Sequence, residues 1–165
     1  MPIRGVFLVT GLPATGKTTL ARALARALQV PLLSKDAIKE PLLDALGASD
    51  RAASRHLSDI SFALLFALAD EHLAVTGAVV LDGNFRPGEH EQAVQGLLAR
   101  HVPMSCTQVL CRVAEPLRQE RLQARAGDGT RHPGHQDAAW VAQAHGSADA
   151  FLAIEGPRFV LCTDP

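Results

Sequence analysis

The feature that most restricts how this chain can fold is a glycine-rich loop near its N-terminus. Residues 11–18 read GLPATGKT and fit the pattern GxxxxGK[ST]. An apolar run at residues 6–9 precedes the loop, and residues 18–29 follow it with a leucine at every fourth position. A strand, a loop and a helix in this order turn backbone N–H groups toward a phosphate, and the helix N-terminus adds positive potential. The sequence therefore predicts a phosphate-binding loop.

The loop also contains the side chains that phosphate chemistry requires. Lys17 can reach the β- and γ-phosphates of a nucleotide, and the Thr18 hydroxyl can bind Mg²⁺. A glycine-rich turn that only caps a helix is the alternative, but it leaves the Lys17-Thr18 pair unexplained. We expect the phosphates of ATP to be bound by Gly11, Leu12, Pro13, Ala14, Thr15, Gly16, Lys17, Thr18 and Thr19.

A carboxylate follows another apolar run further along the chain. Residues 78–81 read AVVL, and Asp82 comes next. At the carboxyl edge of a parallel sheet, Asp82 is a candidate to hold Mg²⁺ together with Thr18. An aspartate that ends a strand is also a common turn former. The phosphate-binding loop favours the first interpretation.

The composition indicates one globular domain over residues 1–165. With 47% hydrophobic and 20% charged residues and a net charge of −1, the chain is neither disordered nor a strongly basic binder of nucleic acid or membrane surfaces. Its longest apolar run, residues 62–69, is too short to cross a bilayer, and we find no signal peptide. We therefore expect a cytoplasmic protein. The sparse cysteines, Cys106, Cys111 and Cys162, fit small buried side chains in a reducing compartment.

Strand-like and helix-like segments alternate along the chain. Apolar runs predict strands at residues 6–9, 31–33, 78–81, 107–113 and 159–162. Amphipathic or capped segments predict helices at 18–29, 36–46, 50–76, 89–101, 115–126 and 138–145. The longest helix, capped by Ser49 or Asp50, has an apolar middle and should be buried on most sides. The alternation predicts an α/β fold with a parallel sheet that helices cover on both faces.

Asp36 follows the second predicted strand, in Ser34-Lys35-Asp36. It can cap the helix that starts at the next residue. It can also orient or deprotonate an acceptor hydroxyl near the γ-phosphate. A carboxylate can do both, and we favour the catalytic role.

The segment from residue 118 to 135 is the most polar part of the chain. Arg121 and Arg125 share a helix face, and a Gly-Asp-Gly turn follows the helix. A solvated basic face is one interpretation. We favour a lid over residues 118–138 that neutralises a transferring phosphoryl group and excludes water. Its candidate contacts to phosphate or acceptor are Arg118, Arg121, Arg125, Arg131, His132 and His135.

Four segments, GLPATGKTT, SKDAIKE, VVLDGNF and RQERLQAR before RHPGH, together cover most of the chain and resemble the small P-loop kinases of the nucleoside-monophosphate-kinase-like fold. Within this group the chain most resembles predicted kinases of the AAA-family ATPases. The resemblance extends to chloramphenicol phosphotransferase, shikimate and gluconate kinases, and polynucleotide kinase domains. The resemblance implies a three-layer α/β/α P-loop fold with a five-stranded parallel sheet in the order 2-3-1-4-5. It also implies that Asp36 is the acceptor base, that Arg121 and Arg125 contact donor phosphates, and that Asp82 and Asn84 face the acceptor or the water shell of Mg²⁺.

Three functions follow from these observations. The first is transfer of the γ-phosphate of ATP, with Mg²⁺, to a hydroxyl of a small molecule. The second is a polynucleotide 5′-hydroxyl kinase, which the lack of Tyr and the presence of one Trp disfavour, because such sites stack bases on aromatic side chains. The third is an ATP-hydrolysing protein without an acceptor. We expect the acceptor pocket between residues 37 and 76, near Arg51, Arg55 and His56. The oligomeric state stays open.

Overall fold

A computed structural model describes residues 3–47, 50–127, 132 and 149–164. The predicted helix at residues 138–145, most of the predicted lid, and the candidate residues Arg131 and His135 lie outside this part of the chain.

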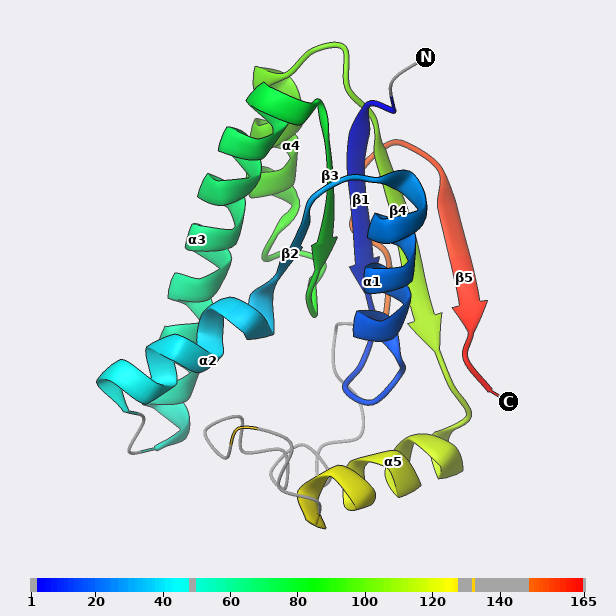
Figure 1. The fold of residues 1–165 in the computed structure, drawn as a ribbon. Helices are drawn as coiled ribbons and strands as arrows, with labels where there is room; N and C mark the ends of the chain where they lie inside the picture. Colours follow the sequence, from blue (N-terminus) through cyan, green and yellow to red (C-terminus); the bar gives the residue numbers. More distant parts are fainter. Residues whose placement is uncertain (1–2, 48–49, 128–131, 133–148, 165) are drawn as a thin grey trace.

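The strands form one parallel sheet, as predicted (Figure 1). Its order, β2-β3-β1-β4-β5, is the one that the kinase resemblance implies. The central strands consist mainly of Val, Leu and other apolar residues that are buried on both faces of the sheet. The strand bounds are β1 (Gly5–Thr10), β2 (Leu32–Ser34), β3 (Ala78–Asp82), β4 (Cys106–Arg112) and β5 (Arg158–Cys162).

Each described helix begins and ends within about two residues of its predicted bounds. In Figure 1, α1 lies in front of the sheet, while α3 and α4 lie together at its left. The carboxyl ends of the strands point toward the end of the molecule where the loop before α1 and helix α5 lie. The helix bounds are α1 (Lys17–Leu28), α2 (Lys35–Leu46), α3 (Arg51–Thr76), α4 (Glu91–Arg100) and α5 (Glu115–Gly127).

Alternate residues of the central strands point into two separate cores, which gives three layers. Val79 and Leu81 of β3 pack with the α3 and α4 side, whereas Val80 between them packs against Ala21 and Ala25 of α1. This alternation is the period-2 geometry of a strand. The sheet is thereby fixed between α1 on one face and the α3–α4 pair on the other.

The long helix α3 is correctly predicted in position but not in burial. Asp50 caps it, because its Oδ1 accepts a hydrogen bond from the Ala53 N–H at 2.8 Å, and Gly77 ends it with a φ of 74°. The prediction that α3 is buried on most sides is wrong. Leu64 and Leu68 are 41% and 43% exposed, since the helix packs on the sheet and on α2 and α4 with one face only.

Coverage of the sheet is also less complete than predicted. Phe159 and Val160 of the edge strand β5 are 57% and 50% exposed. Cys162 on the same strand is exposed, contrary to the expectation that the cysteines are buried. Cys106 and Cys111 are buried, and burial raises their pKa to about 12 and about 11. Neither buried thiol is therefore a ready nucleophile. Within the described ranges, no helix combines the length and apolar character needed to cross a membrane.

Candidate active site

The glycine-rich loop between β1 and α1 adopts a conformation that its glycines make possible. Gly11 has a φ of 144°, and a Cβ at this position would lie 2.5 Å from the carbonyl oxygen of Cys111. Gly16 has a φ of 80° and is the N-cap residue of α1. The Thr15 hydroxyl donates to the Leu12 carbonyl at 2.8 Å and closes the loop on itself. The loop thus wraps the N-terminus of α1, where an anion is stabilised.

Thr18 and Asp82 meet at the carboxyl edge of the sheet, as the sequence predicts. The Thr18 hydroxyl donates to Asp82 Oδ2 at 2.8 Å, and the Ser34 hydroxyl donates to the same oxygen at 3.0 Å. Asp82 is 2% exposed. Among the described residues, its other oxygen, Oδ1, has no hydrogen-bond partner.

Burial raises the pKa of Asp82. The positive charge of Lys17 and the hydrogen bonds from Thr18 and Ser34 oppose this shift. A buried carboxylate oxygen without a partner is costly unless a cation or a donor approaches it. The hydroxyl of Thr18 and the carboxylate of Asp82 are oxygen ligands of the kind that Mg²⁺ prefers. The residues present therefore fit a magnesium ion.

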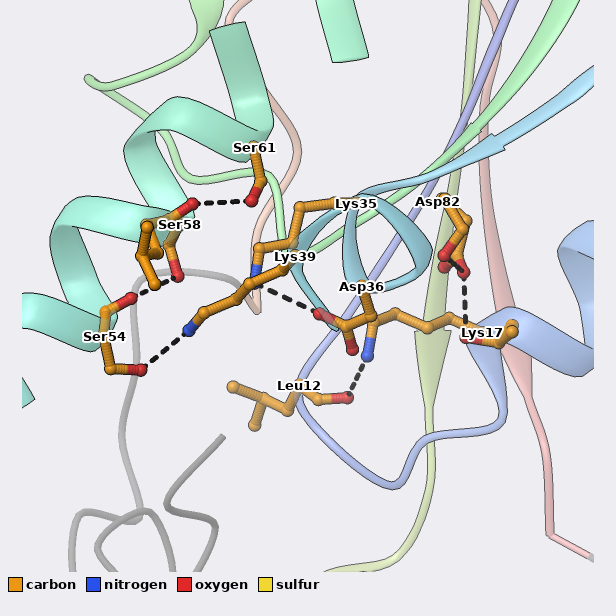
Figure 2. Close-up of polar contacts among 12 residues, drawn as sticks. Leu12, Lys17, Lys35, Asp36, Lys39, Ser54, Ser58, Ser61 and Asp82 are labelled. Atoms are coloured by element: carbon orange, nitrogen blue, oxygen red, sulfur yellow. Dashed lines mark hydrogen bonds and ion pairs between the residues drawn. The ribbon is translucent and has the colours of Figure 1, made fainter. Parts of the chain in front are cut away.

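Asp36 lies in the first turn of α2, near the phosphate-binding loop. Its Oδ1 forms an ion pair with Lys35 Nζ at 3.1 Å, and its side chain is 31% exposed. Its negative charge contributes to raising the pKa of Asp82. Figure 2 shows Asp36, Asp82 and Lys17 together, with Lys17 Nζ donating to the Leu12 carbonyl at 3.5 Å. Asp36 is thus a second, partly exposed carboxylate near Asp82 and Lys17.

The interpretation of Asp36 as a helix cap is wrong. The helix begins one residue earlier than predicted, at Lys35, so Ser34 occupies the N-cap position. The Ser34 side chain makes no capping bond, because its hydroxyl donates to Asp82 instead. Asp36 interacts favourably with the helix dipole from the first turn, but it does not cap the helix.

The two arginines of the shared α5 face line a pocket of about 640 Å³ between α1, α5 and β5. Arg121 donates to the Thr163 carbonyl at 2.9 Å and to its hydroxyl at 3.3 Å. Arg125 also lines a small cavity beside Gly16 and Lys17 of the loop. The larger pocket is lined by Ala14, Gly16, Thr19, Leu20, Ala23, Arg121, Arg125, Leu161 and Thr163.

Other candidates of the predicted lid lie elsewhere. Arg118 is 3% exposed and binds both carboxylate oxygens of Glu115 at 2.7 Å, so it is a structural residue of α5 and not a lid cation. His132 contacts Asp44 near the C-terminal end of α2, with 2.9 Å between Nε2 and Oδ1. Asn84 is partly buried two residues after β3.

Sequence reasoning missed several polar residues around this site. The Ser34 hydroxyl donates to the same Asp82 oxygen as Thr18 does. The Thr163 hydroxyl donates to the Thr15 carbonyl at 2.8 Å, which joins the end of β5 to the loop. Lys35 and Lys39 are both buried on α2. Their spacing of four residues places them on one helix face, which is a signal that the sequence does contain.

Comparisons with known proteins agree with the fold described above. A solved structure of a proposed kinase from Chloroflexus aurantiacus J-10-fl is 35% identical, covers 97% of this chain and 88% of its own, and has a TM-score of 0.86. A gluconokinase from Sinorhizobium meliloti 1021 is 17% identical, and its TM-score is 0.58. The match covers 100% of this chain and 86% of the gluconokinase. The APS kinase of Mycobacterium tuberculosis, solved with AMPPNP and APS, is 19% identical, with coverages of 100% and 91% and a TM-score of 0.58.

The two more distant structures show that the fold is that of small P-loop kinases. Among curated proteins, none matches the chain significantly. A family model described as an AAA domain matches residues 6–159, from β1 into β5. The match takes in the phosphate-binding loop, Asp36, Asp82 and the arginines of α5. The chain therefore belongs to this AAA domain family of P-loop proteins.

Proposed function

We propose that this protein is a kinase that transfers the γ-phosphate of ATP, with Mg²⁺, to a hydroxyl group of a small molecule. The observation that carries the proposal is the meeting of three elements at one edge of the sheet. The loop before α1 supplies the phosphate cradle, the Thr18–Asp82 pair supplies oxygen ligands, and Asp36 supplies a second carboxylate beside them.

The chemistry follows from the roles of these residues. Lys17 would bind the β- and γ-phosphates, and Thr18 with Asp82 would hold Mg²⁺, which supplies positive charge to the phosphates. Asp36 orients the acceptor hydroxyl and takes its proton as the oxygen bonds to the γ-phosphorus. The bond from the γ-phosphorus to the oxygen that bridges it to the β-phosphate breaks, and ADP leaves. Arg125, next to the loop, would neutralise charge on the transferring group.

A small acceptor is favoured over a nucleic-acid end. The structural neighbours named as a gluconokinase and an APS kinase support a small-molecule kinase.

The 640 Å³ pocket has the size of a site for one small ligand, and it lies between α1 and α5, on the donor side of the loop. We assign it to the nucleoside part of ATP, with Arg121 and Thr163 on its wall. The acceptor then approaches from the side of α2, where Asp36 lies.

A product assay tests the proposal. The protein is incubated with ATP and Mg²⁺ and a panel of hydroxyl compounds, and all phosphorylated products are separated and identified. We expect ADP and a phosphorylated small molecule in equal amounts, and neither with Lys17→Ala. A phosphorylated oligonucleotide end would indicate a polynucleotide kinase. ADP and free phosphate alone, with every acceptor, would mean that the proposal is wrong.

A further inference from the structure

Thr163, the residue that follows β5, contacts both the phosphate-binding loop and α5. Its hydroxyl donates to the Thr15 carbonyl at 2.8 Å and accepts a hydrogen bond from Arg121 Nη1 at 3.3 Å. Its carbonyl accepts a second bond from the same guanidinium, from Nη2 at 2.9 Å. One residue thus joins segments that lie 148 and 42 positions away in the sequence. The mechanism proposed above gives Thr163 only a place on the wall of the nucleoside pocket.

Arg121 determines in which direction the Thr163 hydroxyl donates. A hydroxyl has one proton and two lone pairs, whereas a guanidinium has donors only. The hydroxyl must therefore accept from Arg121, which leaves its single proton for a carbonyl. Two carbonyls lie within reach, that of Thr15 at 2.8 Å and that of Arg112 at 3.3 Å. The Arg112 carbonyl already accepts the Thr163 N–H at 2.8 Å, and the Thr15 carbonyl is the nearer of the two. The proton is therefore directed at Thr15.

The bond to Thr15 fixes one peptide plane of the phosphate-binding loop. The peptide between Thr15 and Gly16 is trans, so its carbonyl and the following N–H point in opposite directions. Because the carbonyl points toward Thr163, the Gly16 N–H points away from it. Gly16 does not restrain this peptide by itself, because glycine adopts φ values of either sign, and its φ here is 80°. A partner outside the loop is therefore needed to hold the plane.

The Gly16 N–H belongs to the group that can bind a phosphate. The N–H groups at the start of a helix have no partner within that helix, and in a loop of this kind they surround the phosphates. Gly16 and Lys17 line the small cavity of the loop, together with Arg125. Among the described residues, the lining of this cavity does not include Thr163. Thr163 therefore lies on the outer side of the loop and can act on a phosphate only through it.

The main chain around Thr163 is held by bonds that do not involve its hydroxyl. The Thr163 N–H donates to the Arg112 carbonyl at 2.8 Å, which continues the pairing of β4 with β5. Asp164 Oδ1 accepts the N–H of Ala114, just before α5, at 3.0 Å. We therefore expect β5 and α5 to stay in place when the hydroxyl alone is removed.

We infer that Thr163 is a positioning residue of the phosphate-binding loop. Its hydroxyl holds the Thr15 carbonyl so that the Gly16 N–H is directed at the phosphates of the nucleotide, and Arg121 keeps the hydroxyl in its donating orientation. The inference rests on the phosphate site of the proposed function, but not on the acceptor. The competing explanations are a direct contact of Thr163 with the nucleoside and a purely structural role at the end of β5.

Thr163→Val provides the first test, because it removes the hydroxyl and keeps the shape of the side chain. Calorimetry measures the Kd of ADP and of inorganic tripolyphosphate, each with Mg²⁺. Tripolyphosphate can occupy the phosphate site but has no nucleoside. We expect both Kd values to rise about 10-fold, as for the loss of one hydrogen bond to a charged group. Thr163→Ser, which keeps the hydroxyl, should bind both ligands nearly as well as the unaltered protein.

The matched control is Thr76→Val. The Thr76 hydroxyl also donates to two carbonyls, those of His72 at 2.8 Å and Ala78 at 2.9 Å, but it lies at the end of α3 and before the start of β3, away from the loop. We expect both Kd values to stay unchanged in this variant. Thermal unfolding of each variant shows whether it is folded at the temperature of the titrations.

Three results would overturn the inference. A weaker affinity for ADP with an unchanged affinity for tripolyphosphate would make Thr163 a nucleoside contact. Unchanged affinities for both ligands in Thr163→Val would assign Thr163 a structural role. An equal loss in Thr163→Ser and Thr163→Val would mean that the hydroxyl is not the group that acts.

The same measurements separate this inference from the proposed function, because they do not require transfer of phosphate. Weaker tripolyphosphate binding in Thr163→Val, restored in Thr163→Ser, would support the positioning role even if no acceptor is phosphorylated, a result that contradicts the kinase. Phosphorylation of an acceptor, with unchanged tripolyphosphate binding in Thr163→Val, would support the kinase and overturn the positioning role. Absence of tripolyphosphate binding by the unaltered protein would contradict the phosphate site on which both proposals depend.

Discussion

At the scale of single residues, the site contains two carboxylates whose surroundings differ. Asp82 is almost fully buried and receives two hydroxyl hydrogen bonds on one oxygen. Asp36 is partly exposed and paired with an ammonium group. A buried carboxylate beside a phosphate-binding loop is suited to a cation, whereas a partly exposed one can meet a substrate. The two residues are therefore expected to respond differently to the same substitution.

Asp36→Asn should abolish transfer and leave nucleotide binding nearly intact. The amide keeps the size of the side chain and can still accept a hydrogen bond, but it cannot take a proton. We expect the rate of transfer to fall by about 10² or more. Loss of the ion pair with the buried Lys35 should lower the Tm of the ligand-free protein, whereas the nucleotide-induced gain in Tm should stay nearly unchanged. Transfer rate and the nucleotide-induced shift in Tm are measured on the same preparation. A rate close to that of the unaltered protein would remove Asp36 from the mechanism and direct attention to Asp82.

At the scale of elements, α5 divides its arginines among three tasks. Arg118 is buried against Glu115, Arg121 binds Thr163, and Arg125 lies beside the phosphate-binding loop. The helix thus joins the end of β5 to the mouth of the loop. Sequence periodicity correctly places Arg121 and Arg125 on one face, but it does not reveal which arginine has which partner.

We expect Arg125→Ala to lower kcat about 10²- to 10³-fold, as for the loss of one donor that stabilises a transition state. Arg121→Ala should mainly raise the KM for ATP, because this residue lines the wall of the larger pocket. Gln123→Ala, at an exposed position of the same helix, is the matched control. Steady-state kinetics with thermal unfolding of each variant checks the expectation. Unchanged kinetics in both variants would mean that Arg121 and Arg125 form a solvated basic face and do not act on ATP.

At the scale of the whole molecule, the described strands and helices and the sheet order agree with the prediction, for identifiable physical reasons. Apolar runs such as the one in β3 are buried on both faces, and the leucines of α1 repeat at helical spacing, so the local pattern matches the tertiary environment. The known topology of similar kinases supplied the order of the strands. The phosphate-binding loop was predicted because its chemistry is contained in consecutive residues.

The remaining features depend on residues that are far apart in the sequence. Ser34 and Asp82 are 48 positions apart, and Arg121 and Thr163 are 42 apart. No local pattern predicts which polar side chains such distant segments bring together. The exposure of Leu64 and Leu68 likewise depends on where α2, α4 and the sheet lie around α3, which the composition of the helix does not determine.

The cost of holding Asp82 in a buried site gives a prediction for the stability of the whole chain. Burial raises the folded-state pKa of Asp82 above its usual value of 3.8. The folded state therefore binds this proton more tightly than the unfolded state does. As the pH rises from 3.8 through the raised pKa, the ligand-free protein loses stability. At neutral pH the charged carboxylate destabilises the fold until a cation reaches it.

Asp82→Asn should therefore raise the Tm of the ligand-free protein at pH 7, because the amide can accept the hydrogen bonds from Thr18 and Ser34 without a buried charge. With ADP and Mg²⁺ at 100 times Kd, the unaltered protein should gain about 5–10 °C in Tm, which corresponds to roughly 2.7 kcal/mol for a chain of this size. The gain should be much smaller in Asp82→Asn and, in the unaltered protein, when EDTA removes Mg²⁺.

Asp59→Asn, which replaces an exposed carboxylate on α3, is the control and should behave like the unaltered protein. Thermal unfolding from pH 4 to pH 8, with and without the nucleotide, measures both effects. An equal nucleotide-induced gain in Asp82→Asn and in the unaltered protein would mean that Asp82 does not hold the metal.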